Sequence, residues 1–231
     1  MATDFTEGGM ICLDKPYGMS SFRALARVRF LLSRKLGVRR VKMGHAGTLD
    51  PLATGVLLLC VGKTTKDIPT LQGATKEYVA TLQIGCTTPS FDAEHTVDYT
   101  FPTTHVTAER IEEALALFRG ETTQVPPIYS ACKADGHRAY RMAAAGRSVT
   151  LRAKTVRIDE LEVTLFDRSA MRVDIRVVCG KGTYIRALAR DIGTALGSGA
   201  YLTALRRTRV GDITVGQCMT MEDIPAWIDT L

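Results

Sequence analysis

An uninterrupted apolar run, 56–61 (Val-Leu-Leu-Leu-Cys-Val), constrains the fold of this 231-residue chain more than any other feature. Such a run is typical of a strand that is buried on both faces of a sheet. It directly follows residues 44–55, where glycine and threonine recur and where we expect a loop. We therefore expect an exposed loop at 44–55 that leads directly into a strand of the core.

Other hydrophobic patterns predict the remaining elements. Alternating or short apolar runs indicate strands at 10–13, 77–84, 156–166 and 171–179. Helical spacing indicates helices at 20–36, 107–119 and 184–196, the first capped by Ser20 or Ser21 and the second by Thr107. We expect a polar loop at 86–102. The order neither alternates nor segregates the two kinds of element, which favours an α+β fold with helices packed on a mixed sheet.

The basic residues are unevenly distributed. The formal net charge is +6, and residues 16–49 contain eight basic residues and no acidic one. Residues 133–157 hold seven basic residues against Asp135, and 206–209 (Arg-Arg-Thr-Arg) form a third basic stretch. One such stretch is usually a solvated face, but three separated ones favour a polyanion as partner.

Several classes of site are excluded. Gly55 to Thr64 spells G-x6-G-K-T, whereas a phosphate-binding P-loop needs four residues between its glycines. The four histidines lack the spacing of a metal site, and no H-x-E with Cys-x-x-Cys is present, which excludes a zinc deaminase. Six cysteines lie singly, no apolar run reaches the ~20 residues of a membrane span, and the N-terminus lacks a signal pattern. We expect a cytoplasmic protein with reduced cysteines.

Asp50 is the remaining candidate for chemistry. Taken alone, Asp50-Pro51 is a common way to begin a turn, and its carboxylate is more simply explained as a turn acid than as a catalyst. Gly44, Gly47 and Gly55 let the backbone approach a ligand closely, and the basic stretch just upstream offers phosphate contacts. This setting suits an acid that acts on a nucleic acid.

The sequence resembles the TruB family, the tRNA pseudouridine synthase B group. The matching segments cover nearly the whole chain in order. They are Leu13-Asp14-Lys15-Pro16 with Gly18-Met19-Ser20-Ser21, 44–57 (GHAGTLDPLATGVL), Lys76-Glu77-Tyr78, 124–131 (QVPPIYSA), 180–186 (GKGTYIR) and 202–211 (LTALRRTRVG). The segment 44–57 is highly specific for this family.

The resemblance implies a pseudouridine-synthase-type fold, with a mixed, mainly antiparallel central sheet, flanking helices and a basic thumb insertion at 122–152, in a single catalytic domain 1–231. It also implies conversion of uridine 55 in the T-loop of tRNA to pseudouridine, after base flipping, with no cofactor and no metal. Asp50 matches the nucleophile, Arg186 the arginine that pairs with it, and Tyr78 the tyrosine that stacks on the uracil.

Other matches concern RNA binding. His45 matches a histidine that fills the space of flipped bases, and Leu205 matches an apolar pocket wall. Lys15 and Tyr184 lie in matching motifs and are expected to contact the substrate. In the thumb, Arg138, Arg141 and Arg147 are candidate tRNA contacts. We expect Asp50 to lie in a cleft, paired with Arg186 and facing Tyr78.

About twenty residues follow Gly211, too few for the C-terminal RNA-binding module usual in the family, so we expect weaker tRNA affinity than in longer relatives. Two alternatives stay open. The chain is a tRNA-folding chaperone or RNA-binding module with secondary catalysis, or it is the catalytic subunit of a guide-RNA particle. We expect a monomer with no obligate protein partner.

Overall fold

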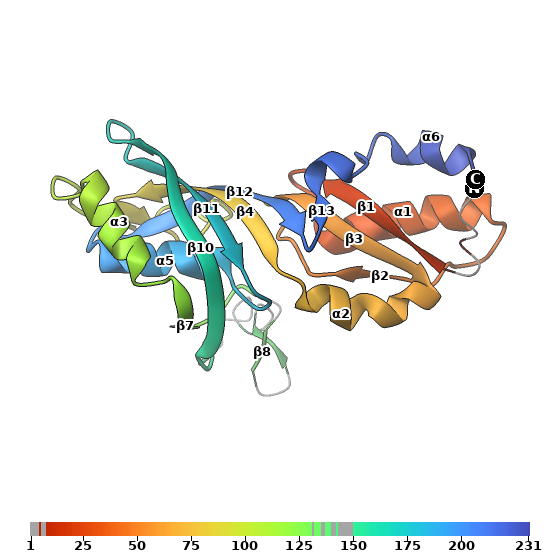
Figure 1. Ribbon diagram of the computed structural model, residues 1–231, viewed down its shortest axis with the longest axis horizontal. Helices are drawn as coiled ribbons and strands as arrows, with labels where there is room; N and C mark the ends of the chain where they lie inside the picture. Colours follow the sequence, from red (N-terminus) through yellow and green to blue (C-terminus); the bar gives the residue numbers. More distant parts are fainter. Residues whose placement is uncertain (1–4, 6–7, 131, 135–136, 140–141, 143–149) are drawn as a thin grey trace. The chain divides into compact units, whose positions relative to one another are not determined.

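Figure 1 shows the computed structural model, which describes residues 5, 8–130, 132–134, 137–139, 142 and 150–231. Two compact units are present. Unit 1 comprises Met1–Tyr78 and Leu205–Leu231, and unit 2 comprises Val79–Ala204. Leu205–Leu231 is thus part of unit 1 and does not form a unit of its own.

Nine strands form the main sheet. Its order is β1 (Gly8–Lys15), β3 (Thr54–Gly62), β12 (Ala200–Val210), β4 (Lys76–Ile84), β11 (Arg172–Cys179), β10 (Lys154–Asp167) and β7 (Gly120–Gln124). Outside this path, β2 (Met43–Ala46) pairs with β3, and β13 (Ile213–Thr214) pairs with β12. Most described pairs are antiparallel, whereas β12 and β3 run parallel, so the predicted mixed, mainly antiparallel sheet is confirmed.

In unit 1, β3 is the central strand. It pairs antiparallel with β1, from Lys15↔Gly55 to Gly8↔Gly62, and with β2. Leu57, Leu59 and Val61 pack into one core cluster, while Val56 and Leu58 pack into a second. The prediction of a strand buried on both faces is therefore confirmed.

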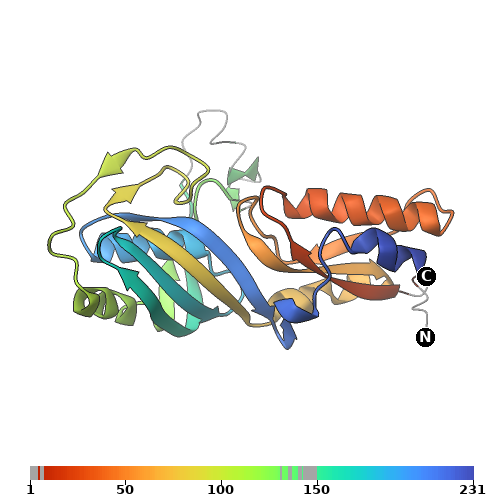
Figure 2. The same ribbon diagram turned by 90° about the horizontal axis from the view of Figure 1, so that it is seen from above.

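Helix α1 (Ser21–Lys35) covers the first of these faces together with the short helix α6 (Ile224–Asp229) (Figure 2). The Ser20 hydroxyl caps α1 by accepting a hydrogen bond from the Arg23 amide. Ala24, Leu25, Val28 and Leu32 are buried at helical spacing. The predicted helix and its cap are confirmed to within one residue.

In unit 2, β10 forms a long antiparallel pair with β11 and continues to β7. Helices α3 (Ala108–Ala116) and α5 (Ile185–Ala195) lie beside this part of the sheet (Figure 1). Their buried residues include Ile111, Leu115, Leu188 and Ile192. Two short antiparallel ladders lie outside the main sheet, β5 (Cys86–Thr87) with β6 (Tyr99–Thr100) and β8 (Lys133–Ala134) with β9 (His137–Arg138).

Some elements differ from the prediction. The predicted loop 44–55 contains the end of β2 and the start of β3. Helix α2 (Ile68–Gly73), the 3₁₀ turns η1 (Lys63–Asp67) and η2 (Val215–Gln217), α6 and β12 were not predicted. Within the described residues, no helix combines the length and apolar character needed to cross a membrane.

Candidate active site

Asp50 lies in the turn between β2 and β3, and the backbone around it is fixed from several sides. The Ser21 hydroxyl donates to the Leu49 carbonyl oxygen and accepts from the Leu49 amide, both at 2.8 Å. The Gly18 amide donates to the Pro51 carbonyl oxygen at 2.9 Å, and the Ala53 amide donates to that of Asp50 at 3.1 Å. Leu49 is buried while Asp50 is partly exposed. The carboxylate thus stands on a rigid, supported turn.

Lys15 also supports the Asp50 turn, through hydrogen bonds to backbone oxygens. Its side chain is fully buried, and its ammonium group donates to the carbonyl oxygens of Pro16 at 2.8 Å, Met19 at 2.6 Å and Pro51 at 3.4 Å. Burial lowers the pKa of Lys15 to about 8, although Asp50 acts in the opposite direction. The Lys15 amine thus joins two loops through their backbone oxygens, and its predicted contact with the substrate stays a prediction.

Arg207 is a second buried cation near Asp50. Only 1% of the residue is exposed, and its guanidinium donates to the carbonyl oxygens of Val56 at 2.7 Å and Gly47 at 3.1 Å. Its charge also helps to lower the pKa of Lys15. The Asp50 turn is therefore held by two buried cations, which create a positive potential where the carboxylate stands.

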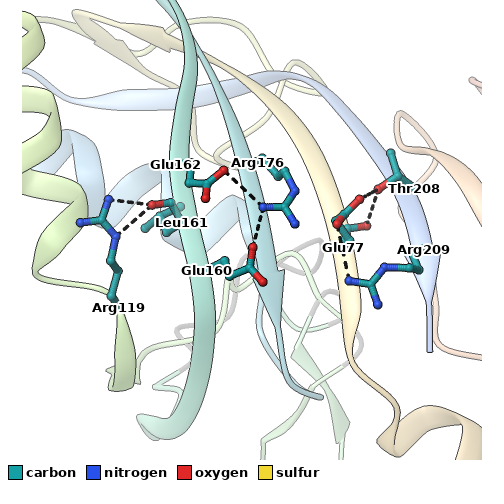
Figure 3. A network of polar contacts seen from close by, with 8 residues as sticks. All are labelled: Glu77, Arg119, Glu160, Leu161, Glu162, Arg176, Thr208 and Arg209. Atoms are coloured by element: carbon teal, nitrogen blue, oxygen red, sulfur yellow. Dashed lines mark hydrogen bonds and ion pairs between the residues drawn. The ribbon is translucent and has the colours of Figure 1, made fainter. Parts of the chain in front are cut away.

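The third basic stretch, 206–209, is not a free positive surface. Arg207 is buried, and Arg206 forms an ion pair with Asp14 at 2.7 Å. Arg209 lies 3.5 Å from Glu77, which also accepts a hydrogen bond from Thr208 (Figure 3). Arg207 is thus engaged inside the protein, whereas 41% and 31% of the Arg206 and Arg209 side chains are exposed, so contact of this stretch with a polyanion stays a prediction.

The other unit 1 candidates occupy defined positions. His45 lies in β2; burial, and then Arg207, lower its pKa, which favours the neutral imidazole at pH 7. Its Nδ1 is buried and has no hydrogen-bond partner in the described part of the chain. Tyr78 is buried in β4, and Leu205 is partly exposed in β12.

Arg186 is buried in α5 of unit 2, where its contacts include Ser90, Tyr129 and Asp92. Its guanidinium donates to the carbonyl oxygens of Ser90 at 3.1 Å and Tyr129 at 2.8 Å. Its Nε lies 3.5 Å from Oδ2 of Asp92, with 4% and 8% of the two side chains exposed. Contact between Arg186 and Asp50, which belong to different units, stays a prediction.

Sequence reasoning missed Asp92, which it placed in a polar loop. The Asp92 carboxylate accepts hydrogen bonds from the Ser90 hydroxyl at 2.6 Å and the Glu94 amide at 3.0 Å. Phe91, which lies between Ser90 and Asp92, has a positive φ of 60°. An Asp that binds the amide two residues later is a recognised turn signal, and it could have indicated a fixed carboxylate here.

The remaining candidates lie in unit 2. The Tyr184 hydroxyl is 3.0 Å from Sγ of Cys132, and its amide donates to the Gln124 side chain at 2.8 Å. Arg138 belongs to β9, whereas Arg141 and Arg147 lie outside the described residues. Among the described residues, no group of three or more His, Cys, Asp or Glu side chains is placed to hold a metal ion.

Family models match in two consecutive segments. Residues 33–185 match the N-terminal domain of the TruB family of pseudouridylate synthases, and residues 186–230 match the C-terminal domain of tRNA pseudouridylate synthase B. This C-terminal match corresponds to α5, β12, β13 and α6, which are built into the two units.

Curated relatives cover almost the whole chain. The tRNA pseudouridine synthase B of Phocaeicola vulgatus is 55% identical over 98% of this chain and 95% of its own length. That of Mycobacterium bovis is 46% identical over 95% of this chain and 72% of its own length.

A solved structure has the same fold. A chain in the crystal structure of a Cbf5–Nop10–Gar1 complex superposes with a TM-score of 0.70 at 30% identity. The match covers 97% of this chain but only about half (54%) of the longer chain in that complex. On these findings the chain belongs to the TruB family of tRNA pseudouridine synthases, which are isomerases.

Proposed function

We propose that this enzyme converts uridine 55 in the T-loop of tRNA to pseudouridine, with Asp50 as the nucleophile. The observation that carries the proposal is the construction of the Asp50 turn. Ser21, Lys15 and Arg207 fix its backbone through hydrogen bonds, while the Asp50 residue itself stays partly exposed. A reactive group held this rigidly needs little reorganisation when substrate binds.

The reaction rearranges bonds within one nucleotide. The bond between N1 of uracil and C1′ of ribose breaks, the base turns, and a bond forms between C5 and C1′. C5 loses its proton and N1 gains one, so atoms and electrons balance without an oxidant or reductant. A carboxylate can serve as a nucleophile in such transfers. The buried cations Lys15 and Arg207 bind the backbone of the turn that carries Asp50.

Base flipping brings the uridine to Asp50, because a stacked nucleotide inside a folded loop cannot reach the carboxylate. We assign His45 to the space left by the flipped bases; as a neutral imidazole it suits a role in packing. Tyr78 stacks on the uracil, Leu205 lines its pocket, and Arg186 stabilises the Asp50 carboxylate. The Asp92 carboxylate keeps the Arg186 guanidinium oriented.

Substitution of Asp50 tests this proposal. Asp50→Asn keeps the size of the side chain and removes its charge. We expect it to abolish tritium release from tRNA labelled at uracil C5, while tRNA binding is retained. A transcript with cytidine at position 55 should release no tritium from any other uridine. Loss of both binding and catalysis in Asp50→Asn would instead identify a structural acid.

The structural similarity to Cbf5 favours a second candidate, because a matching archaeal Cbf5 structure is that of a Nop10–Cbf5 complex of a box H/ACA sRNP. Activity on an isolated T-arm stem-loop without any guide RNA distinguishes the two. We expect full activity under these conditions. A strict requirement for an added guide would support the particle subunit, and normal tRNA refolding by Asp50→Asn would support an additional chaperone role.

A further inference from the structure

We propose that the outward face of α1 is a second RNA-binding surface, which holds the phosphate backbone of the substrate tRNA outside the target nucleotide. The proposal rests on the proposed function for the identity of the RNA. Its physical basis is a row of four side chains, Arg23, Arg27, Phe30 and Arg34, referred to as the α1 stripe.

The α1 stripe lies on one side of the helix. Its members stand at positions i, i+4, i+7 and i+11, which share a face at 3.6 residues per turn. All four are exposed, whereas Ala24, Leu25, Val28 and Leu32 are buried. At 1.5 Å per residue the row is about 16 Å long, enough to meet several phosphates of one strand.

In the part of the chain that the structure describes, no acidic side chain compensates the charge of the stripe. No acidic residue occurs from Pro16 to Leu49, and Arg23, Arg27 and Arg34 form no ion pair within the described residues. Like charges four residues apart, as in Arg23 and Arg27, destabilise a helix. A surface that retains such repulsion, without a structural partner, is suited to an external polyanion.

Aromatic side chains stand among these arginines. Phe22 and Phe30 are 68% and 60% exposed. The Arg34 guanidinium lies over the Phe30 ring, 5.9 Å from its centroid, which holds the cation on the stripe. Alternating cationic and aromatic groups are typical of surfaces that bind nucleic acid backbone and bases.

A membrane surface is a poor fit for the same helix. A helix that binds lipid buries its apolar face among the acyl chains. In α1 that face is already occupied, because it packs on β1 and β3 in the core of unit 1. Only the cationic face is available, which fits a polyanion that makes contact through phosphates.

The position of α1 connects the stripe to the target nucleotide. Ser21, the first residue of α1, binds the backbone of Leu49 next to Asp50. The stripe thus begins beside the catalytic turn and leads away from it along the helix. Phosphate contacts position RNA without reading its sequence, so the stripe contributes to affinity and leaves the chemical step unchanged.

The test is a triple variant, Arg23→Gln, Arg27→Gln and Arg34→Gln, in the full chain. Glutamine retains helix propensity, so α1 is expected to form. The dissociation constant of unmodified tRNA transcript is measured over a range of salt concentrations. Each phosphate contact adds about 0.7 to the slope of the logarithm of the dissociation constant against the logarithm of the salt concentration. We therefore expect this slope to be smaller by about 2 in the triple variant. The kcat at saturating tRNA should equal that of the wild type.

The matched control removes three other exposed arginines, Arg110→Gln, Arg168→Gln and Arg172→Gln, in unit 2. Two of them interact electrostatically with acids, Arg168 with Glu109 and Arg172 with Asp167. The control has the same net charge as the stripe variant, and its salt slope should stay at the wild-type value. Equal slopes for the stripe variant and the control would overturn the proposal.

Two further readouts keep the interpretation unambiguous. The single variants Arg23→Gln and Arg34→Gln should each lower the slope by about 0.7, which covers the case that the triple variant is unstable. A fall in kcat with an unchanged slope would assign α1 to catalysis and reject the stripe. If the wild type bound tRNA without isomerising uridine 55, the proposed function would fail, while a changed slope would still support the stripe.

Discussion

Gly55 lies directly against the backbone of Arg207, so that a methyl group added to its α-carbon would overlap the Arg207 carbonyl oxygen. The two residues are also aligned in the parallel pair of β12 and β3. Gly55 has a φ of 104°, which residues with a side chain rarely adopt. This close approach lets the buried Arg207 guanidinium reach the backbone of Gly47 and Val56 on either side of the Asp50 turn.

We therefore expect Gly55→Ala to be severe. Backbone strain and overlap together should lower the free energy of unfolding by about 2–5 kcal/mol. Gly73→Ala is the matched control, because nothing lies within 4 Å of its added methyl group. Urea unfolding should show a change within about 1 kcal/mol for the control. Similar stabilities for the two variants would contradict the close approach.

Ser21→Ala separates the support of Asp50 from the capping of α1. It leaves the amide and carbonyl of Leu49 without their partner in a buried place, which should cost about 1–3 kcal/mol of stability. Displacement of Asp50 should lower kcat by roughly 10- to 100-fold.

The control is Ser20→Ala, which removes the N-cap of α1 at a cost of about 1 kcal/mol. Single-turnover kinetics should show a wild-type rate for Ser20→Ala. If both variants were slowed equally, general loosening of α1 would explain the effect, and the specific role of Ser21 would be rejected.

The elements that the sequence predicted correctly are those with a local signal. The apolar run of β3 and the helical spacing of apolar residues in α1 each predict which residues are buried, and Ser20 indicates where the helix begins. Strand β12 gave no such signal, because Arg206, Arg207 and Arg209 interrupt its apolar pattern. Their partners, Asp14, Gly47 and Glu77, are distant in sequence, so the contacts of these cations could not be inferred from the neighbouring residues.

The same distinction applies to the candidate site. Asp50 was identified from its motif, but the groups that support it are 28 to 160 residues apart in the chain, as for Ser21–Leu49 and Arg207–Gly47. Asp92 was missed since a single acid in a polar loop has no periodic pattern. Its place beside Arg186 depends on the fold of unit 2.

Asp92→Asn tests the buried pair with Arg186. Loss of one charge from a buried pair should reduce the free energy of unfolding by about 3 kcal/mol. If Arg186 supports Asp50 as proposed, kcat should fall as well, while tRNA binding is retained. Asp159→Asn is the control, because its ion pair with Arg157 is exposed to solvent and contributes little to stability. An Asp92→Asn enzyme with wild-type stability and kcat would exclude a role for this pair.

Lys15 gives a prediction for the pH dependence of stability. In the unfolded chain its amine has the ordinary pKa of 10.5, whereas burial lowers it to about 8 in the fold. Between these values the unfolded chain binds more protons than the folded one, so this group makes the free energy of unfolding rise with pH. Below about pH 8 both states are protonated, and the contribution is constant.

Lys15→Met removes this contribution. The difference in unfolding free energy between wild type and Lys15→Met should be flat from pH 6 to about 8. It should then rise in favour of the wild type by on the order of 1–3 kcal/mol towards pH 10.5. Lys35→Met, at an exposed position, shows the effect of removing a surface lysine. A difference that stays flat throughout would mean that the Lys15 amine keeps its ordinary pKa and that its burial is offset by the three carbonyl oxygens it binds.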